Sequence, residues 1–335
     1  MSATGQSGLA TLSLRDKFSA PGTTRAHQSG VDSHSRDGIA MEIPKKFGRY
    51  EIVDLIAICE APGIVYKARD PDAERQVMLL VRPVPEGSPE ARLRWLGKQK
   101  RQCSFRHANI VMVYEVGELE GSAYMAMEFL DGEPLDSVIR KGTPLSLLQR
   151  IDIVSQVSDA LQFVHDHDVV HLEVRPGHVI QSRDGKAKLV GLDSPFFRPM
   201  DMGIAYPWRP IIGRIAYMAP EQLNGQELDR RADIFSLGLT CYELVEGRSP
   251  FEGDSSVDVV KKILGEPPRP SQKARELHLP ELQRVFDKAL AKQRDARYQS
   301  CAEFSRDLDR VRERLEFEPR GRVSTWLMGV RRLFN

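Results

Sequence analysis

The stretch from His171 to Asp193, HLEVRPGHVIQSRDGKAKLVGLD, constrains the fold more than any other part of the sequence. It begins in a loop of charged and turn-forming residues, continues through two short apolar runs around Asp184-Gly185, and ends in a second polar loop. An Asp-Gly pair between two apolar runs is a strong signal for a β-hairpin. Because the two polar loops flank one hairpin, we expect them to face the same way and to form a functional surface.

The part of the chain before this hairpin is β-rich. Alternating runs predict three antiparallel strands over 50–56, 64–69 and 76–81, then a helix over 88–104 and two further strands over 110–116 and 123–129. Ser88-Pro89-Glu90 is a typical helix start. The sequence therefore predicts a small sheet with one helix.

From Pro134 onward the pattern becomes helical. Leu147, Ile151, Val154, Leu161 and Val164 share one face of a long amphipathic helix. A second helix, around 234–244, has few charges on any side and is predicted to be central and buried. Further helices are expected at 255–264, 280–291 and 301–316.

Composition limits the class of protein. The 335 residues are 41% hydrophobic and 28% charged, with a net charge of +1, which argues against a dedicated nucleic-acid binder. The four cysteines are far apart and without metal-ligand spacing, as expected in a reducing compartment. We predict no transmembrane helix and no secretory signal, and therefore a cytoplasmic protein.

The two ends differ from the middle. Residues 1–46 are rich in Ser, Gly, Thr and Ala and are predicted to be a disordered tail. Residues 317–335 combine arginines with Trp326, Leu327 and Phe334 in a basic amphipathic tail. Its 320–335 part either contacts an anionic membrane surface or a partner groove, or docks onto its own domain.

Seven motifs give the chain a resemblance to eukaryotic-type Ser/Thr protein kinases, in the style of the bacterial members. In order they are GRYEIVDLI, VYKARDP, MEFLDGEPL, HLEVRPGHVI, YMAPEQL, ADIFSLGLTCYELVEGRSPF and ALAKQRDARYQS. The resemblance covers roughly residues 47–316 and implies a two-lobed α+β fold. A small antiparallel β lobe with one helix would span 47–128, and a larger α-helical lobe 129–316.

The resemblance also implies where ATP would bind, and several of those positions depart from the family pattern. The vestigial pocket would be formed by Gly63, Val65, Met78, Met127, Glu128, Phe129 and Ile180. The glycine-rich loop keeps only Gly63 of its glycines, and Pro62 has no N–H to offer a phosphate. Leu80 stands where the family has the phosphate-binding lysine, and Lys98 where it has the partner glutamate.

The catalytic and metal positions are altered as well. Glu173 takes the place of the aspartate base and is one methylene longer, while Arg175 replaces a lysine. His178 replaces an asparagine that binds Mg²⁺, and imidazole suits that hard cation poorly. Gly191 replaces the main metal-binding aspartate, and Asp193 lies two positions further on.

The activation segment lacks a phosphorylation site. Leu172 removes the arginine that would hold a phosphate, residues 195–212 contain no Ser or Thr, and Arg214 stands where a threonine is expected. Aromatic and proline residues in 195–212 suit either internal packing or a protein interface, for example with an active kinase or another signalling component.

The positions that stabilise the family fold are retained, namely Glu221, Arg297, Asp233, His171 and Gly238. This division favours a pseudokinase that binds partners, with no cofactor and no metal ion expected. The alternative is a weakly active Ser/Thr kinase that uses ATP and Mg²⁺, with Glu173 as base, Lys98 for phosphate and Asp193 for metal.

Overall fold

The computed structural model describes residues 43–58, 63–84, 88–192 and 212–317. These residues form two compact units, the first comprising the described parts of 43–104 and 113–129 and the second those of 105–112, 130–192 and 212–317. Residues 1–42 and 318–335 of the predicted tails and the 195–211 segment lie outside the described residues, as do Asp193 and the glycine-loop residues 59–62. Lys46, at the end of the predicted N-terminal tail, belongs to a strand, and Phe317, the first residue of the predicted C-terminal tail, ends a helix. No helix in the described ranges is long and apolar enough to cross a membrane.

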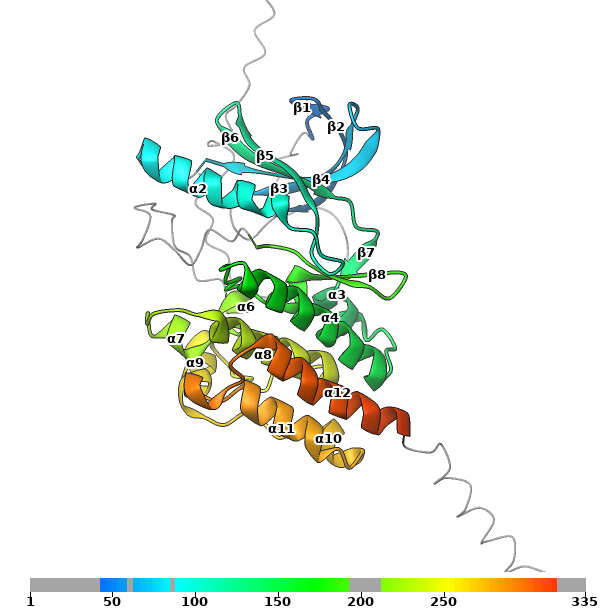
Figure 1. Ribbon diagram of the computed structural model, residues 1–335, viewed down its shortest axis with the longest axis vertical. Coiled ribbons are helices and arrows are strands. Elements are labelled where there is room, and N and C mark those ends of the chain that lie inside the picture. Colours follow the sequence, from blue (N-terminus) through cyan, green and yellow to red (C-terminus); the bar gives the residue numbers. More distant parts are fainter. Residues whose placement is uncertain (1–42, 59–62, 85–87, 193–211, 318–335) are drawn as a thin grey trace, which may run out of the picture. The chain divides into compact units, whose positions relative to one another are not determined.

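The first unit is an antiparallel sheet with one helix, as predicted. The strands are β1 (Lys46–Phe47), β2 (Tyr50–Ile58), β3 (Ile64–Asp70), β4 (Arg75–Pro83), β5 (Val113–Leu119) and β6 (Ser122–Glu128), in the order β1-β2-β3-β4-β6-β5 (Figure 1). Glu120 and Gly121 both have positive φ, which suits the two-residue turn between β5 and β6.

The core of this unit follows from strand alternation. Val77, Leu79 and Val81 on β4 are buried, whereas Met78 and Leu80 between them point to the opposite face. Helix α2 (Pro89–Arg101), followed by a 3₁₀ turn (Gln102–Ser104), packs against the sheet through buried Trp95. The guanidinium of Arg82 lies 4.9 Å from the centre of the Trp95 ring.

The second unit is mainly helical. Its helices are α3 (Leu135–Lys141), α4 (Leu147–Asp166), α6 (Ile212–Ile215), α7 (Pro220–Leu223), α8 (Arg230–Glu246), α9 (Ser256–Gly265), α10 (Gln272–Glu276), α11 (Pro280–Ala289) and α12 (Cys301–Phe317). Two 3₁₀ turns cover Pro176–His178 and Arg294–Ala296. A small sheet joins β7 (Gly132–Pro134), β8 (Val179–Ser182) and β9 (Ala187–Leu189). The predicted hairpin at Asp184-Gly185 is therefore confirmed as β8–β9.

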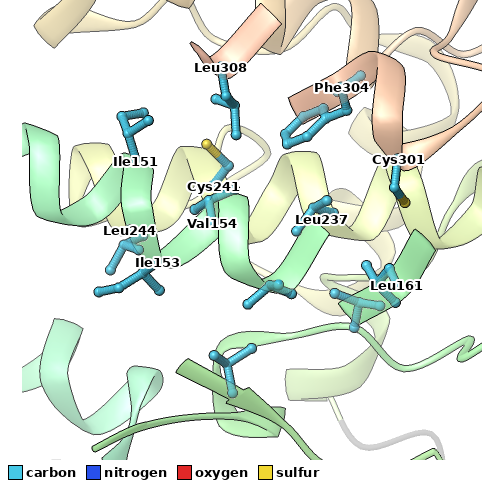
Figure 2. Packing of buried hydrophobic residues seen from close by; sticks show 14 of the residues in the cluster. Ile151, Ile153, Val154, Leu161, Leu237, Cys241, Leu244, Cys301, Phe304 and Leu308 are labelled. Carbon is cyan, nitrogen blue, oxygen red and sulfur yellow. The ribbon is translucent and has the colours of Figure 1, made fainter. Parts of the chain in front are cut away.

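The core of the second unit lies between α4, α8 and α12. Ile151 and Val154 of α4 meet Leu237 and Cys241 of α8 and Phe304 of α12 (Figure 2). Helix α8 is buried along nearly all of its length, which confirms the prediction from its low charge. Ser146 caps α4 in a reciprocal capping box with Gln149, and Asp229 caps α8, so both long helices begin at satisfied N-termini.

One predicted strand is displaced. The expected run over 110–116 is a strand only from Val113, and it continues to Leu119. Ile110 instead forms an isolated parallel bridge with Leu189 of β9. Pairing with a residue 79 positions later in the chain decides the boundary, and apolar periodicity alone does not report such a contact.

Candidate functional site

In the first unit, the expected nucleotide-binding residues Val65, Met78 and Met127 share the face of the sheet opposite its core. Strand pairing brings Val65, Leu80 and Met125 into one row across β3, β4 and β6, and Lys67, Met78 and Met127 into the next. Directly paired residues of antiparallel strands point to the same side. This face therefore carries thioether and branched aliphatic groups at the positions where the family pattern has alanine and lysine.

Leu80 leaves this face without an ammonium group at the phosphate position. A β-carbon built on Gly63 would lie 3.4 Å from Leu80 Cδ1, so the aliphatic side chain reaches the remaining glycine of the loop. The amino group of Lys67 lies 4.5 Å from the centre of the Phe129 ring, in a cation–π contact. Lys98 lies in α2, and its side chain is outside the described part of the chain.

Two further expected pocket residues, Glu128 and Ile180, lie in strands β6 and β8. Glu128 ends β6 and is partly buried. Ile180 belongs to the second unit, where it pairs with Pro134 of β7 and Lys188 of β9.

In the second unit, the buried carboxylate of Asp233 fixes the loop that begins at His171. Its Oδ2 accepts the backbone N–H of His171 at 2.8 Å and the ring of His165 at 2.7 Å, and Oδ1 accepts the N–H of Leu172 at 2.6 Å. Leu172 has a φ of +65°, an unusual conformation for a residue with a branched side chain. The loop backbone is thus held as the resemblance implied, with Asp233 as its anchor.

The expected base, Glu173, is paired with Arg214. One guanidinium nitrogen, Nη2, lies 2.8 Å from Oε1 and donates a hydrogen bond of 3.0 Å to Oε2. The side chains are only 5% and 13% exposed, so water screens the pair weakly. They line a small, partly open pocket together with Leu172, Val174, Arg175, Tyr217 and Met218.

His178 is bonded at both ring nitrogens within this loop. Nδ1 lies 2.8 Å from the carbonyl oxygen of Glu173, and Nε2 lies 3.3 Å from Nη2 of Arg175. A carbonyl only accepts and a guanidinium only donates, so Nδ1 carries the proton and Nε2 accepts. Burial, reinforced by the positive charge of Arg175, lowers the pKa of His178 well below its usual range. The imidazole is therefore neutral, with its lone pair directed at Arg175.

The His178 ring also fills the space beside Gly191. A β-carbon on Gly191 would lie 3.0 Å from Nδ1 and 3.1 Å from Cε1, closer than side chains normally approach. Gly191 has a φ of +85°, which favours glycine independently of that contact. His178 and Gly191 do not fit a Mg²⁺ site, because one presents no oxygen and the other no side chain. In the described ranges no group of three or more His, Cys, Asp or Glu side chains is arranged to hold a metal ion.

The buried ion pair expected between Glu221 and Arg297 is confirmed. Nη1 and Nη2 of Arg297 donate to the two carboxylate oxygens at 2.7 and 2.8 Å. Arg297 also donates to the carbonyls of Ala291, Arg231 and Lys292. This pairing joins α7 to the segment before α12 and leaves the guanidinium well satisfied.

Sequence reasoning identified Arg214 as a replaced threonine but not as the partner of Glu173. The two residues are 41 positions apart, and only the folded chain brings them together. The signal available in the sequence was the simultaneous presence of a longer carboxylate at 173 and a cation at 214. Likewise, the sequence shows that His178 and Gly191 depart from the family pattern. It does not show that the His178 ring packs against the Cα of Gly191.

Comparison with known proteins gives matches over most of the chain. The family described as "Protein kinase domain" matches residues 62–315. The serine/threonine-protein kinase PknB of Mycolicibacterium smegmatis is 33% identical over 280 residues, covering 79% of this chain and 43% of PknB. PknB of Mycobacterium leprae is 33% identical over 282 residues, covering 80% of this chain and 44% of that protein.

PknA of Mycobacterium tuberculosis is 34% identical over 229 residues, covering 67% of this chain and 52% of PknA. The chain thus spans about half or less of the length of these relatives.

Proposed function

Since the chain belongs to the protein kinase domain family and has the two-part α+β fold of a Ser/Thr protein kinase, we propose that it is a pseudokinase, a binding or allosteric module in signalling without phosphate transfer. The fold-stabilising contacts of Asp233 and of Glu221 with Arg297 support a well-formed domain.

The observation that carries the proposal is the His178–Gly191 contact. Phosphate transfer in the family requires metal ions that bridge the nucleotide phosphates. Here the ring of His178 occupies the space beside Gly191, and both its nitrogens are bonded within the protein. Two metal-ligand positions have therefore become a packed, neutral contact, and we propose that Mg²⁺ is not a cofactor.

The side chains of Leu80 and Met78 in the first unit support the corresponding proposal for ATP. An aliphatic Leu80 offers no charge to the α- and β-phosphates, and Met78 adds volume where the family has a methyl group. We therefore propose that ATP is not a cofactor either. ATP and Mg²⁺ would be required only if residual activity exists.

The proposed partners are proteins. The 195–212 segment, rich in aromatic residues and prolines, is the proposed contact for an active kinase or another signalling component. Nucleic acid is not a proposed partner, because the net charge is only +1. Contact of 320–335 with an anionic membrane surface is a separate proposal, based on the basic and aromatic residues there.

Phosphate transfer from radiolabelled ATP by the purified full chain tests the proposal. We expect incorporation equal to that of Glu173→Ala, with an active bacterial kinase domain as positive control. A signal above that of Glu173→Ala would reject the proposed lack of activity.

One observation favours the second candidate, a weakly active Ser/Thr kinase. Glu173 and Arg175 keep the acidic and basic character of the family's loop, whose backbone is held by Asp233. Transfer that is abolished in Glu173→Ala and retained in Arg269→Thr, a change in an exposed ion pair, would support this candidate.

A further inference from the structure

Hydrogen bonds hold the segment that follows Arg214 to helix α8 and to the loop that begins at His171. The hydroxyl of Tyr217 donates to Glu243, and the hydroxyl of Ser236 donates to the carbonyl of Tyr217 at 2.7 Å. The amide of Gln222 donates to the carbonyl of Leu172 at 3.1 Å. The guanidinium therefore reaches Glu173 from a backbone anchored to α8 and to the loop itself.

The contact between Arg214 and Glu173 is a buried, charged interaction. Nη2 lies within hydrogen-bonding distance of both carboxylate oxygens, and neither side chain is more than 13% exposed. Charged hydrogen bonds are stronger than neutral ones, and burial reduces their exchange with water. An exposed ion pair such as Arg269 with Glu252 lacks this protection, since both side chains are more than 40% exposed.

We propose that Arg214 is an internal plug for Glu173, an autoinhibitory side chain that closes the carboxylate to any hydroxyl, water or reagent entering the pocket. The guanidinium forms the pocket wall beside the carboxylate, donates a hydrogen bond to Oε2 and lies 2.8 Å from Oε1. The plug deepens the proposed function, because it names the residue that keeps the former base closed. It requires no nucleotide, phosphate or partner.

Carboxyl labelling of the intact protein tests the plug directly. A water-soluble carbodiimide with glycine ethyl ester converts accessible carboxyl groups to amides, and peptide mass spectrometry gives the labelling rate of Glu173. Arg214→Thr should raise that rate by about tenfold, the factor expected when a contact of ordinary coupling strength is lost. Arg214→Lys, which keeps the charge and loses the planar fork, should give a smaller increase.

Arg269→Thr is the matched control, since it makes the same substitution in an exposed ion pair and should leave Glu173 labelling unchanged. Circular dichroism checks that each variant is folded, and Arg214→Lys carries the test if Arg214→Thr does not fold. Equal labelling of Glu173 in wild type and in the folded Arg214 variant would overturn the plug.

This outcome is independent of the proposed lack of phosphate transfer, which the radiolabel assay on the wild-type protein decides. If transfer is detected and labelling still rises in Arg214→Thr, the plug stands as a brake on an active kinase. If no transfer is detected and labelling does not rise, the pseudokinase proposal stands without the plug.

Discussion

The imidazole of His178 lies against the Cα of Gly191, where a β-carbon would come within 3.0 Å of Nδ1. These two positions replace two metal ligands of the family pattern, and in the folded chain each accounts for the other. A side chain at 191 would displace the ring, and a smaller group at 178 would leave a gap. The two substitutions therefore form one structural unit.

Restoring a side chain at 191 should destabilise the protein more than positive φ alone explains. Gly185 is the matched control, since its φ is +82° and a β-carbon there meets nothing within 4 Å. We expect Gly191→Ala to lower the free energy of unfolding by about 1–3 kcal/mol more than Gly185→Ala, the usual range for overpacking. Urea denaturation measures both. Adding His178→Ala should remove most of the difference, and an undiminished difference would contradict the contact.

Acid should weaken the fold through His178. Its folded-state pKa is lowered, so below the ordinary value of about 6.5 the unfolded chain binds a proton that the folded protein excludes. The stabilising contribution is complete above pH 6.5 and is lost as the pH falls, by up to about 1.4 kcal/mol per pH unit.

Urea denaturation between pH 7 and pH 5 should therefore show a steeper loss for wild type than for His178→Asn. If stability falls equally with pH in the two proteins, His178 has the same proton affinity in the folded and unfolded states, and the predicted effect is absent.

The buried pair of Arg297 with Glu221 should contribute strongly to the stability of the fold. Arg297→Met leaves a carboxylate with 1% exposure and no cation, and we expect a loss of about 3–5 kcal/mol in unfolding free energy. Arg269→Met, which breaks an exposed pair, should cost no more than about 1 kcal/mol. Thermal and urea melts compare the two variants. Similar losses would show that the Arg297 bridge contributes no more than a surface contact.

The two faces of β4 should respond differently to a lysine. Leu79 is completely buried in the core of the first unit, whereas Leu80 points to the opposite face and is partly exposed. Leu79→Lys should lower the free energy of unfolding by about 2–5 kcal/mol, because it buries a charge and disrupts the packing of the core. Leu80→Lys should cost far less, and equal melting curves for the two variants would contradict the strand register.

Much of the fold could be predicted from local pattern. The alternation of Val77, Leu79 and Val81 predicts one buried face of β4, and the scarcity of charge around Leu237 and Cys241 predicts the buried α8. Short elements such as β7, α3 and α10 carry too few residues for a periodic signal, and none was predicted individually. The start of β5 was misplaced because Ile110 pairs with Leu189.

The candidate site was predicted as a set of substitutions but not as a network. Position by position, the sequence shows that Glu173, His178, Gly191 and Arg214 depart from the family pattern. Their contacts span up to 41 residues and depend on ring orientation, tautomer and backbone φ, which one-dimensional spacing does not report. Asp233 and Arg297 were predicted more fully because their partners follow from the retained motifs.

The most direct test of the account is the effect of Mg²⁺ on ATP binding, measured by calorimetric titration of the purified full chain with and without the metal. If His178 fills the metal position and Leu80 removes the phosphate contact, Mg²⁺ should not strengthen ATP binding, and millimolar ATP should give no saturable heat in either condition. Saturable binding that becomes about tenfold tighter with Mg²⁺, a gain of about 1.4 kcal/mol, would contradict the proposal that the metal site is closed.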